Sequence, residues 1–288
     1  MKKSLFIVLA ISLFIGGCNT VSLFYRNADM YLQHKIYGYT SFNAQQKKVI
    51  EQDVSDYMSW HRKNALPAYI IFLQNLNGAA QYKGRLSAGE IALLREQLLD
   101  LYKKTFAPVI KPSAEILSSL DSEQIQELKK NLANENQEID REELDIGEQK
   151  SLDKRADRTV DFLEWLAGDL SREQEQKVRE MSRNLPFVKD IYIRQREANQ
   201  RRLIYLLNDH ASTETIAAFL SSWLWTPEAT RSSQQQHAIE SFELASDEMI
   251  ARIHGLLTDR QKDHIHKKIS SYIDDMRAEN RKSQKNPS

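Results

Sequence analysis

The stretch Leu257-Thr258-Asp259-Arg260-Gln261 decides the fold class, because it has the composition of a helix start. The hydroxyl of Thr258 can accept a hydrogen bond from a backbone N–H in the first turn, a group that otherwise has no partner. The amide of Gln261 can reach back to the backbone N–H of Thr258, which completes a capping box. The stretch therefore predicts that a helix begins directly after Thr258.

The same pattern occurs at four earlier places in the chain. In each, an apolar residue precedes Asn, Ser or Asp, and Glu or Gln follows three positions later. The four stretches are Phe42-Asn43-Ala44-Gln45-Gln46, Leu86-Ser87-Ala88-Gly89-Glu90, Leu120-Asp121-Ser122-Glu123-Gln124 and Leu170-Ser171-Arg172-Glu173-Gln174. Successive caps are 44, 34, 50 and 87 residues apart. Such unequal intervals argue against a solenoid of fixed repeat length.

Apolar residues between the caps recur every three or four positions, which is helical spacing. This spacing predicts a helical hairpin over residues 236–277 that turns at 255–258. Thr226-Pro227 has the form of a cap followed by a first helical residue. Breaks or kinks are expected at Pro67, Pro108, Pro112 and Pro186. We find no convincing alternating strand, so we expect an all-α fold, an elongated bundle of roughly nine to ten helices.

The predicted helical domain covers residues 18–277, and two stretches of the chain are set apart by their polarity. Residues 134–157 are dense in Glu, Asp, Gln and Lys, and form either a solvated helical arm or a hinge between two halves of the domain. We favour the arm. Residues 278–288 are polar and are expected to form a flexible tail.

Residues 1–17 have the organisation of a cleaved signal peptide. Lys2 and Lys3 precede an apolar run over residues 5–15, and two glycines follow before Cys18, the single cysteine of the chain. The run of 11 residues is shorter than the roughly 20 that a membrane-spanning helix needs. The leader therefore predicts export, after which the mature chain begins at Cys18.

The leader and Cys18 together resemble the lipobox of bacterial lipoproteins. The resemblance implies that the thiol of Cys18 is acylated and that the protein is held to a membrane by this lipid. Asn19 follows, where an aspartate would retain such a protein at the inner membrane. The resemblance thus implies a position on the periplasmic face of the outer membrane. Because the lipid consumes the only thiol, no disulfide or cysteine metal site remains, and the fold must be held by packing.

The overall charge argues against binding to nucleic acid. The 288 residues include 40 Lys and Arg and 40 Asp and Glu, and the leader removes two lysines, which leaves a net charge of about −2. A dedicated nucleic-acid binder would carry a basic excess. The same balance argues against a strongly polybasic membrane surface.

The most distinctive polar and aromatic cluster is Trp60-His61-Arg62. As a binding site, it would offer a stacking face, a titratable group and a guanidinium fork for carboxylate or phosphate. As a structural element, Trp60 would pack in the core, and the other two side chains would bond local backbone where Pro67 ends the helix. We favour the structural interpretation.

Two further groups have alternative interpretations. Arg194, Arg196, Arg201 and Arg202 lie on a predicted helix over residues 187–208, where they form either a grip for an anionic glycan or lipid headgroup, or a solvated stripe balanced by acids. Trp223 and Trp225 are either core anchors or a partner-binding edge, and burial is favoured.

The sequence carries no pattern that indicates a catalytic or metal centre. It has no HExxH, no acidic calcium loop, no GxSxG and no phosphate-binding glycine loop. His264 and His266 would face opposite sides of a helix, and His254 lacks an evident third ligand beside His264. We therefore expect no cofactor, no metal and no enzymatic activity.

Two family resemblances add to this picture. The stretches at 257–261 and 170–174 resemble the LTxxQ motif of Spy- and CpxP-type periplasmic helical proteins. Cys18, Tyr25-Arg26-Asn27 and the stretch from Trp60 to Tyr69 resemble an uncharacterised family of Gram-negative lipoproteins, a domain of unknown function. That resemblance implies a largely helical envelope protein and brings no activity or site residue.

The leading hypothesis is a lipid-anchored, non-enzymatic envelope protein that binds or scaffolds another envelope component. A Spy-like periplasmic chaperone or stress-response protein is the first alternative, on the strength of the two LTxxQ-like stretches. A cell-wall hydrolase is the second, although its acid and base would come from residues with no local signature.

Overall fold

The computed structural model describes residues 20–285, and within them the chain is helical throughout, joined by short loops. Residues 1–19, with the leader and Cys18, lie outside the described residues. The α-helices are α2 (Thr20–Tyr37), α3 (Ala44–Trp60), α4 (Leu66–Gln81), α5 (Ala88–Phe106), α6 (Ile110–Ser118), α7 (Ser122–Glu143), α8 (Glu148–Ala167), α9 (Arg172–Arg183), α10 (Lys189–Asn208), α11 (Thr213–Trp225), α12 (Ser233–Leu256) and α13 (Asp259–Lys285). A π-helix, η2 (His61–Ala65), and two 3₁₀ turns, η3 (Ala107–Val109) and η4 (Pro227–Thr230), complete the set. The all-α multi-helix prediction is confirmed.

The five capping boxes predicted from the sequence are all present. The hydroxyl of Thr258 accepts from the backbone N–H of Gln261 at 3.3 Å, and the amide oxygen of Gln261 accepts from the backbone N–H of Thr258 at 2.9 Å. The boxes at Asn43, Ser87, Asp121 and Ser171 have the same reciprocal bonds. A sixth box at Ser232 begins α12 and had not been predicted. These six helix starts are therefore fixed by local chemistry, whereas α6, α8 and α10 begin without a side-chain cap.

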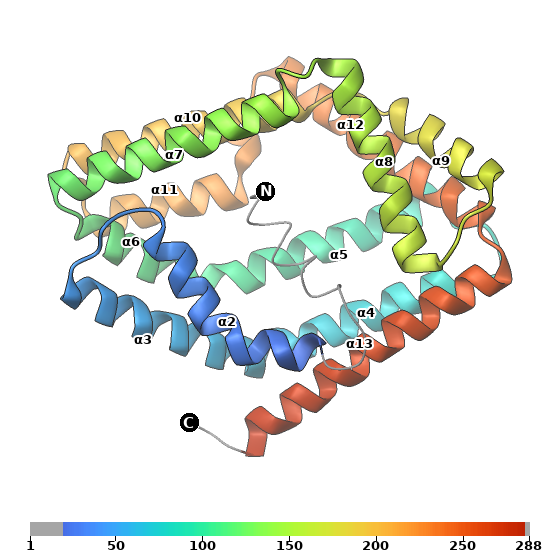
Figure 1. Ribbon diagram of the computed structural model, residues 1–288, viewed down its shortest axis with the longest axis horizontal. Helices are drawn as coiled ribbons and strands as arrows, with labels where there is room; N and C mark the ends of the chain where they lie inside the picture. Colours follow the sequence, from blue (N-terminus) through green and yellow to red (C-terminus); the bar gives the residue numbers. More distant parts are fainter. Residues whose placement is uncertain (1–19, 286–288) are drawn as a thin grey trace.

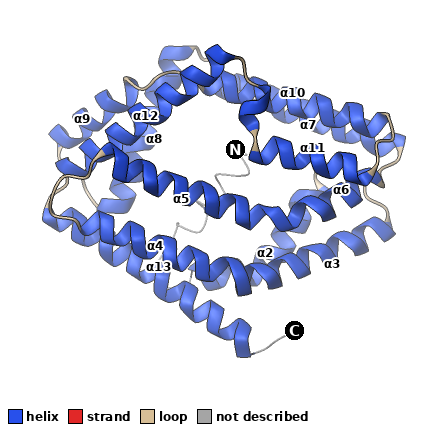
Figure 2. Ribbon diagram, turned by 180° about the vertical axis from the view of Figure 1, so that it is seen from behind, coloured by secondary structure: helices blue, strands red, loops and turns tan. Residues whose placement is uncertain are grey.

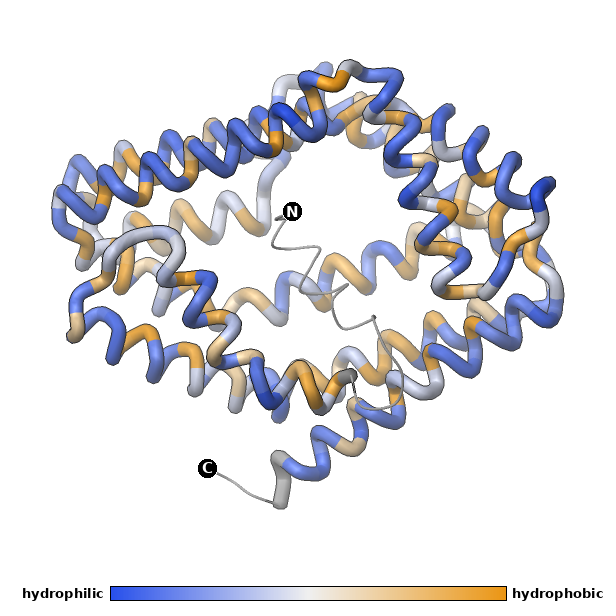
Figure 3. The backbone as a smooth tube through the Cα atoms, viewed as in Figure 1, coloured by the Kyte–Doolittle hydropathy of each residue, from blue (hydrophilic) through white to orange (hydrophobic). Residues whose placement is uncertain are grey.

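Antiparallel helix pairs run around the molecule as a flattened frame (Figures 1 and 2). The closest pairs are α4 with α13, α8 with α9, α6 with α11, α5 with α12, α7 with α10 and α2 with α3. Apolar positions recur along each helix between polar ones, and α7 is mostly hydrophilic (Figure 3). One cluster of buried apolar side chains extends from Val21 on α2 to Met276 on α13, so both ends of the described chain share a core.

The two C-terminal helices do not form the hairpin that the sequence predicted. Helix α12 ends and α13 begins at the predicted turn, but the two helices diverge after Leu257. The former packs against α5 and α9, and the latter lies along α4. The reason is that each apolar stripe finds a better partner elsewhere in the chain, which spacing along a single segment does not reveal.

Residues 278–285 belong to α13, although the sequence predicted a flexible tail from residue 278. Glu279 is buried and its carboxylate lies 3.8 Å from the guanidinium of Arg62. The amide of Asn280 donates to the carbonyl of Arg62, and the ammonium of Lys282 donates to the hydroxyl of Ser22, each at 3.0 Å. These polar contacts hold the last turns against α2 and η2, which a count of apolar residues does not detect.

The polar segment at residues 134–157 forms the end of α7, a turn and the start of α8. Gly147 has φ of +83°, a conformation that side chains with a Cβ rarely adopt, and it opens α8. Arg155 donates to the carbonyls of Ser182 and Leu185, both at 2.7 Å. The segment is therefore tied to the end of α9 by its charged side chains.

Each helix within residues 20–285 is either too short or too polar to cross a lipid bilayer.

Candidate functional site

His61 lies in a π-turn that joins α3 to α4. The backbone N–H of Leu66 donates to the carbonyl of His61, five residues earlier. Pro67 has no N–H and its ring would clash with the carbonyl four residues before it, so the wider turn accommodates it. The break or kink predicted at Pro67 is present as this π-turn between α3 and α4, but the chain stays helical through Pro67, so the proline does not end the helical course. His61 continues the buried face that Val54 and Met58 form on α3, and its side chain is 5% exposed.

A chain of side-chain hydrogen bonds runs through His61. The hydroxyl of Tyr25 lies 2.7 Å from Nδ1, and the hydroxyl of Tyr69 lies 3.1 Å from Nε2. Tyr69 donates to the hydroxyl of Thr105 at 3.0 Å, and Thr105 donates to the carbonyl of Leu101 at 2.8 Å. Tyr69 donates its only hydroxyl proton to Thr105, so its oxygen accepts from Nε2 of His61. Nε2 therefore carries the imidazole proton, and Nδ1 accepts from the hydroxyl of Tyr25. This Tyr25–His61–Tyr69–Thr105 chain connects α2, η2, α4 and α5.

Burial sets the protonation of the chain. It lowers the pKa of His61 to about 4, with a smaller contribution from the positive charge of Arg62. It also raises the pKa of Tyr25 and of Tyr57 well above the usual range for tyrosine. At neutral pH the imidazole is therefore neutral and both tyrosines keep their protons.

The neighbours of His61 in sequence have different roles. Arg62 donates to the backbone carbonyl of Tyr25 at 2.8 Å, and its guanidinium lies 5.2 Å from the centre of the Tyr25 ring. Trp60 is half-buried and stacks on Tyr57, with ring centres 5.9 Å apart. Arg62 thus reaches α2, some 37 residues away in the chain, rather than local backbone as the structural interpretation expected.

Most of this cluster could not be found from sequence. Trp60-His61-Arg62 was noticed as a motif, but its partners Tyr69 and Thr105 were not singled out. Tyr25 was quoted only within the family resemblance. The local signal for the burial of His61 is its spacing, since it follows Val54 and Met58 on the same face of α3.

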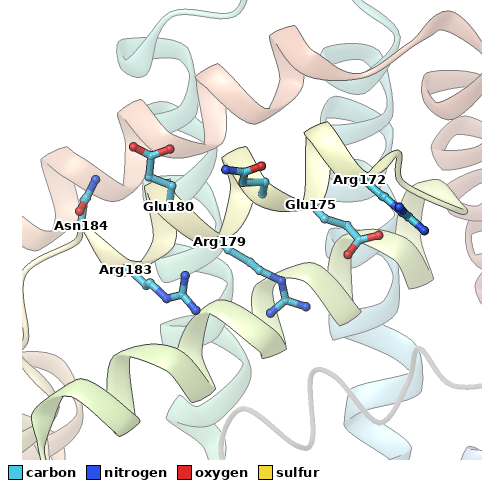
Figure 4. A pocket seen from close by; sticks show the side chains of 7 residues that line it. Arg172, Glu175, Arg179, Glu180, Arg183 and Asn184 are labelled. Carbon is cyan, nitrogen blue, oxygen red and sulfur yellow. The ribbon is translucent and has the colours of Figure 1, made fainter.

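A hollow of about 410 Å³ lies on α9. It is lined by Arg172, Glu175, Gln176, Arg179, Glu180, Arg183 and Asn184. Figure 4 shows Arg179 and Arg183 pointing towards the neighbouring α8, with Glu180 on the other side. Arg179 pairs with Asp157, and Arg183 lies 2.6 Å from the carboxylate of Asp153. With both guanidinium groups engaged by α8, the hollow offers a mixed-charge surface.

A second hollow, of about 220 Å³, lies between α4 and α5. We call it the α4–α5 groove, and its lining is Ala68, Ile71, Phe72, Asn75, Gln97, Asp100, Leu101 and Lys104. Ile71 is 60% exposed. The polar residues pair with one another at the edges, with the Asn75 amide 3.2 Å from Gln97 and Lys104 2.7 Å from Asp100. The groove thus combines an apolar surface with a charged rim, a composition common at protein interfaces.

Two clusters proposed from the sequence lie apart from these hollows. On α10, Arg194 pairs with Asp140 at 3.1 Å and Arg196 with Glu135 at 2.8 Å, so both guanidinium groups bridge to α7. Trp223 packs on Phe219 beside the main core, and Trp225 meets Tyr102 of α5 with ring centres 6.2 Å apart. Arg194, Arg196 and Trp225 therefore make contacts between helices. Arg201 pairs with Glu197 at 3.9 Å and Arg202 lies over the ring of Tyr205, both within α10.

The histidines considered as metal ligands point to separate partners. His254 lies 3.3 Å from the carbonyl of Ala80, and His266 lies 3.0 Å from the amide oxygen of Asn77. Within residues 20–285, no three His, Cys, Asp or Glu side chains are grouped so that they could hold a metal ion.

The two LTxxQ-like stretches meet in the folded protein. The amides of Gln174 and Gln261 donate to each other, at 2.9 and 3.1 Å. Gln46 and Gln124 form a second such pair, at 3.1 and 2.7 Å. We call these the two glutamine clasps. Since the second clasp joins stretches without the LTxxQ sequence, the arrangement is a way of packing two helix starts together.

The fold and the Tyr25–His61–Tyr69–Thr105 chain define an all-α protein whose helices are linked by buried hydrogen-bonded side chains. The model of a family of unknown function, DUF6279, matches residues 38–234. This covers more than half of the chain, which therefore belongs to that family. No curated protein and no solved structure matches the chain. Helices α2 and α13 lie outside the matched residues.

Proposed function

We propose that this protein is a lipoprotein of the Gram-negative envelope, anchored through Cys18 on the periplasmic face of the outer membrane. Its helical body would serve as a non-enzymatic scaffold that binds another envelope component. The leader and the cysteine that follows it support the anchor, and the packing of α2 supports the scaffold.

The observation that carries the proposal is the burial of α2 directly after Cys18. Helix α2 begins at Thr20, and Val21, Tyr25 and Ala28 are at most 2% exposed. A lipid on Cys18 would therefore be joined to the folded core through only one intervening residue before the helix. Such an attachment holds the body at the membrane surface, which suits a scaffold better than a long flexible tether does.

The α4–α5 groove is the surface that we propose for the partner. Its lining joins the exposed Ile71 with the ion pair of Lys104 and Asp100, which would exclude wrong partners and fix the register of the right one. The mixed-charge hollow on α9 lacks such an apolar centre among its lining residues.

A crosslinking experiment in intact cells tests both parts. Cys18→Ser should abolish labelling of the protein by radioactive palmitate and release it from membranes. Ile71→Asp should remove a reproducible crosslinked partner, whereas Leu244→Asp, at an equally exposed apolar position on α12, should keep it. Unchanged crosslinking in the Ile71 variant would contradict the groove assignment.

Two further assays separate this proposal from the alternatives. Suppression of client aggregation by the leader-free protein at equal stoichiometry would favour a chaperone instead. Release of fragments from purified cell wall by the same protein would favour a hydrolase.

A further inference from the structure

Helix α2 has an outer face that no other helix covers. Its exposed residues recur every three or four positions and so share one side of the helix. They are Leu23, Arg26, Asn27, Met30, Tyr31 and His34. Leu23 is 55% exposed and Met30 is 67% exposed. In Figure 1 α2 crosses in front of α3, and in Figure 2 it lies behind it, so α2 belongs to one broad side of the molecule.

The exposed residues of α2 that the structure describes are apolar, neutral polar or basic, and none is acidic. Lys35 lies beside this face, with its ammonium 5.5 Å from the centre of the Tyr31 ring. At the other end of the helix, the exposed side chain of Lys282 on α13 adds positive charge next to Ser22. The only carboxylate paired there, that of Glu279, is buried against Arg62 and Lys282.

The distance from Cys18 to α2 limits what can cover this face. Two residues of extended chain span at most about 7 Å. Acyl chains on Cys18 would therefore bring the first turn of α2 to the lipid headgroups. The helix is about 27 Å long, and Leu23, Met30 and Tyr31 are spread over more than two of its turns. A helix that lies flat brings all three to the bilayer, whereas an upright helix brings only the first.

We propose that the outer face of α2 lies flat on the phospholipid surface, with Leu23, Met30 and Tyr31 among the headgroups. The basic side chains at both ends would then meet anionic headgroups, as in other interfacial helices. This inference rests on the lipid proposed for Cys18, and it adds a fixed orientation to the anchor. The body of the frame would face away from the membrane with α2 as its base.

Electron paramagnetic resonance with a single nitroxide label tests this orientation. The lipidated protein carries no free thiol, so Met30→Cys introduces one site for the label. Leu244→Cys is the matched control, because Leu244 on α12 is 68% exposed. Both proteins are reconstituted into vesicles of phosphatidylethanolamine and phosphatidylglycerol. Accessibility to a water-soluble nickel chelate is then measured.

We expect the label at residue 30 to be about fivefold less accessible to nickel than the label at residue 244, as for a side chain in the headgroup layer. In the unlipidated Cys18→Ser background without vesicles, the two labels should be equally accessible. Equal accessibility on vesicles would overturn the inference, and it is also the result expected if a protein partner covers α2. Failure of either protein to stay with the vesicles would instead overturn the anchor.

Discussion

At the scale of single residues, His61 shows how this fold controls a titratable group. The side chain is buried, its two nitrogens are bonded to the hydroxyls of Tyr25 and Tyr69, and the nearest charge is the guanidinium of Arg62. Burial and that charge both disfavour the imidazolium. A second N–H on this ring, at Nδ1, would also leave the hydroxyl of Tyr25 with no acceptor for its own proton. The neutral histidine therefore links α2 to α4 through these two hydrogen bonds.

This environment predicts a specific dependence of stability on pH. The pKa of His61 falls from 6.5 to about 4 on folding, so between these values the unfolded chain binds the proton and the folded chain does not. The contribution of neutral His61 to the free energy of unfolding should therefore be fully present above pH 6.5. The free energy of unfolding should fall by up to about 3 kcal/mol as the pH drops to 4.

Urea unfolding between pH 7 and pH 4 measures this contribution. His61→Gln keeps one donor and one acceptor and does not titrate, so its stability should decline less steeply over the same range. Parallel curves for the two proteins would contradict the assignment.

At the scale of helices, starts could be predicted from sequence and partners could not. A capping box spans four residues, and its chemistry is complete within them, so all five predicted boxes are present. The glutamine clasps use the same side chains but join residues 78 and 87 positions apart. Each amide also bonds a backbone carbonyl just before the other helix, as Gln174 does with Leu256. Nothing local to either box indicates this pairing.

The clasp between Gln174 and Gln261 should appear as coupling in a double-mutant cycle. Each change to Ala removes a cap contact and should cost about 1 kcal/mol, and the double variant should differ from the sum by at least about 0.5 kcal/mol. The control cycle combines Gln174→Ala with Gln124→Ala, from different clasps, and should be additive. Thermal or urea unfolding gives these values, and equal coupling in both cycles would rule out a clasp-specific interaction.

The ion pair between α5 and α12 is a second element-scale contact that sequence did not show. The carboxylate of Asp247 is 2% exposed and receives 3.0 and 3.1 Å hydrogen bonds from Arg95. Arg95→Met would leave this buried charge unpaired and should cost about 3 kcal/mol. Arg252→Met, which breaks an exposed pair with Glu248 on α12, should cost less than about 1 kcal/mol. Similar losses in the two variants, measured by urea unfolding, would argue against this difference.

At the scale of the whole molecule, the two ends of the described chain are packed together. Helix α13 lies against α4, α2 and α8, and its last turns contact Ser22 and the carbonyl of Arg62. The prediction of a tail from residue 278 failed because polar contacts, rather than apolar spacing, hold these turns. The candidate site shows the same limit. Its residues come from four elements, and only the Trp60-His61-Arg62 motif was visible in sequence.

The packing of α2 in the core would make the proposed lipid anchor control the orientation of the protein. A lipid at Cys18 would act directly on a helix buried in the core, so the membrane would fix where the α4–α5 groove is presented. The orientation of the whole molecule would therefore depend on the chemistry of the Cys18 side chain.

Mass spectrometry of the N-terminal peptide from the membrane fraction tests that chemistry most directly. We predict a chain that begins at Cys18 and carries a diacylglyceryl thioether together with an acylated amino group. A peptide that still contains residues 1–17, or one with an unmodified Cys18 thiol, would contradict the account.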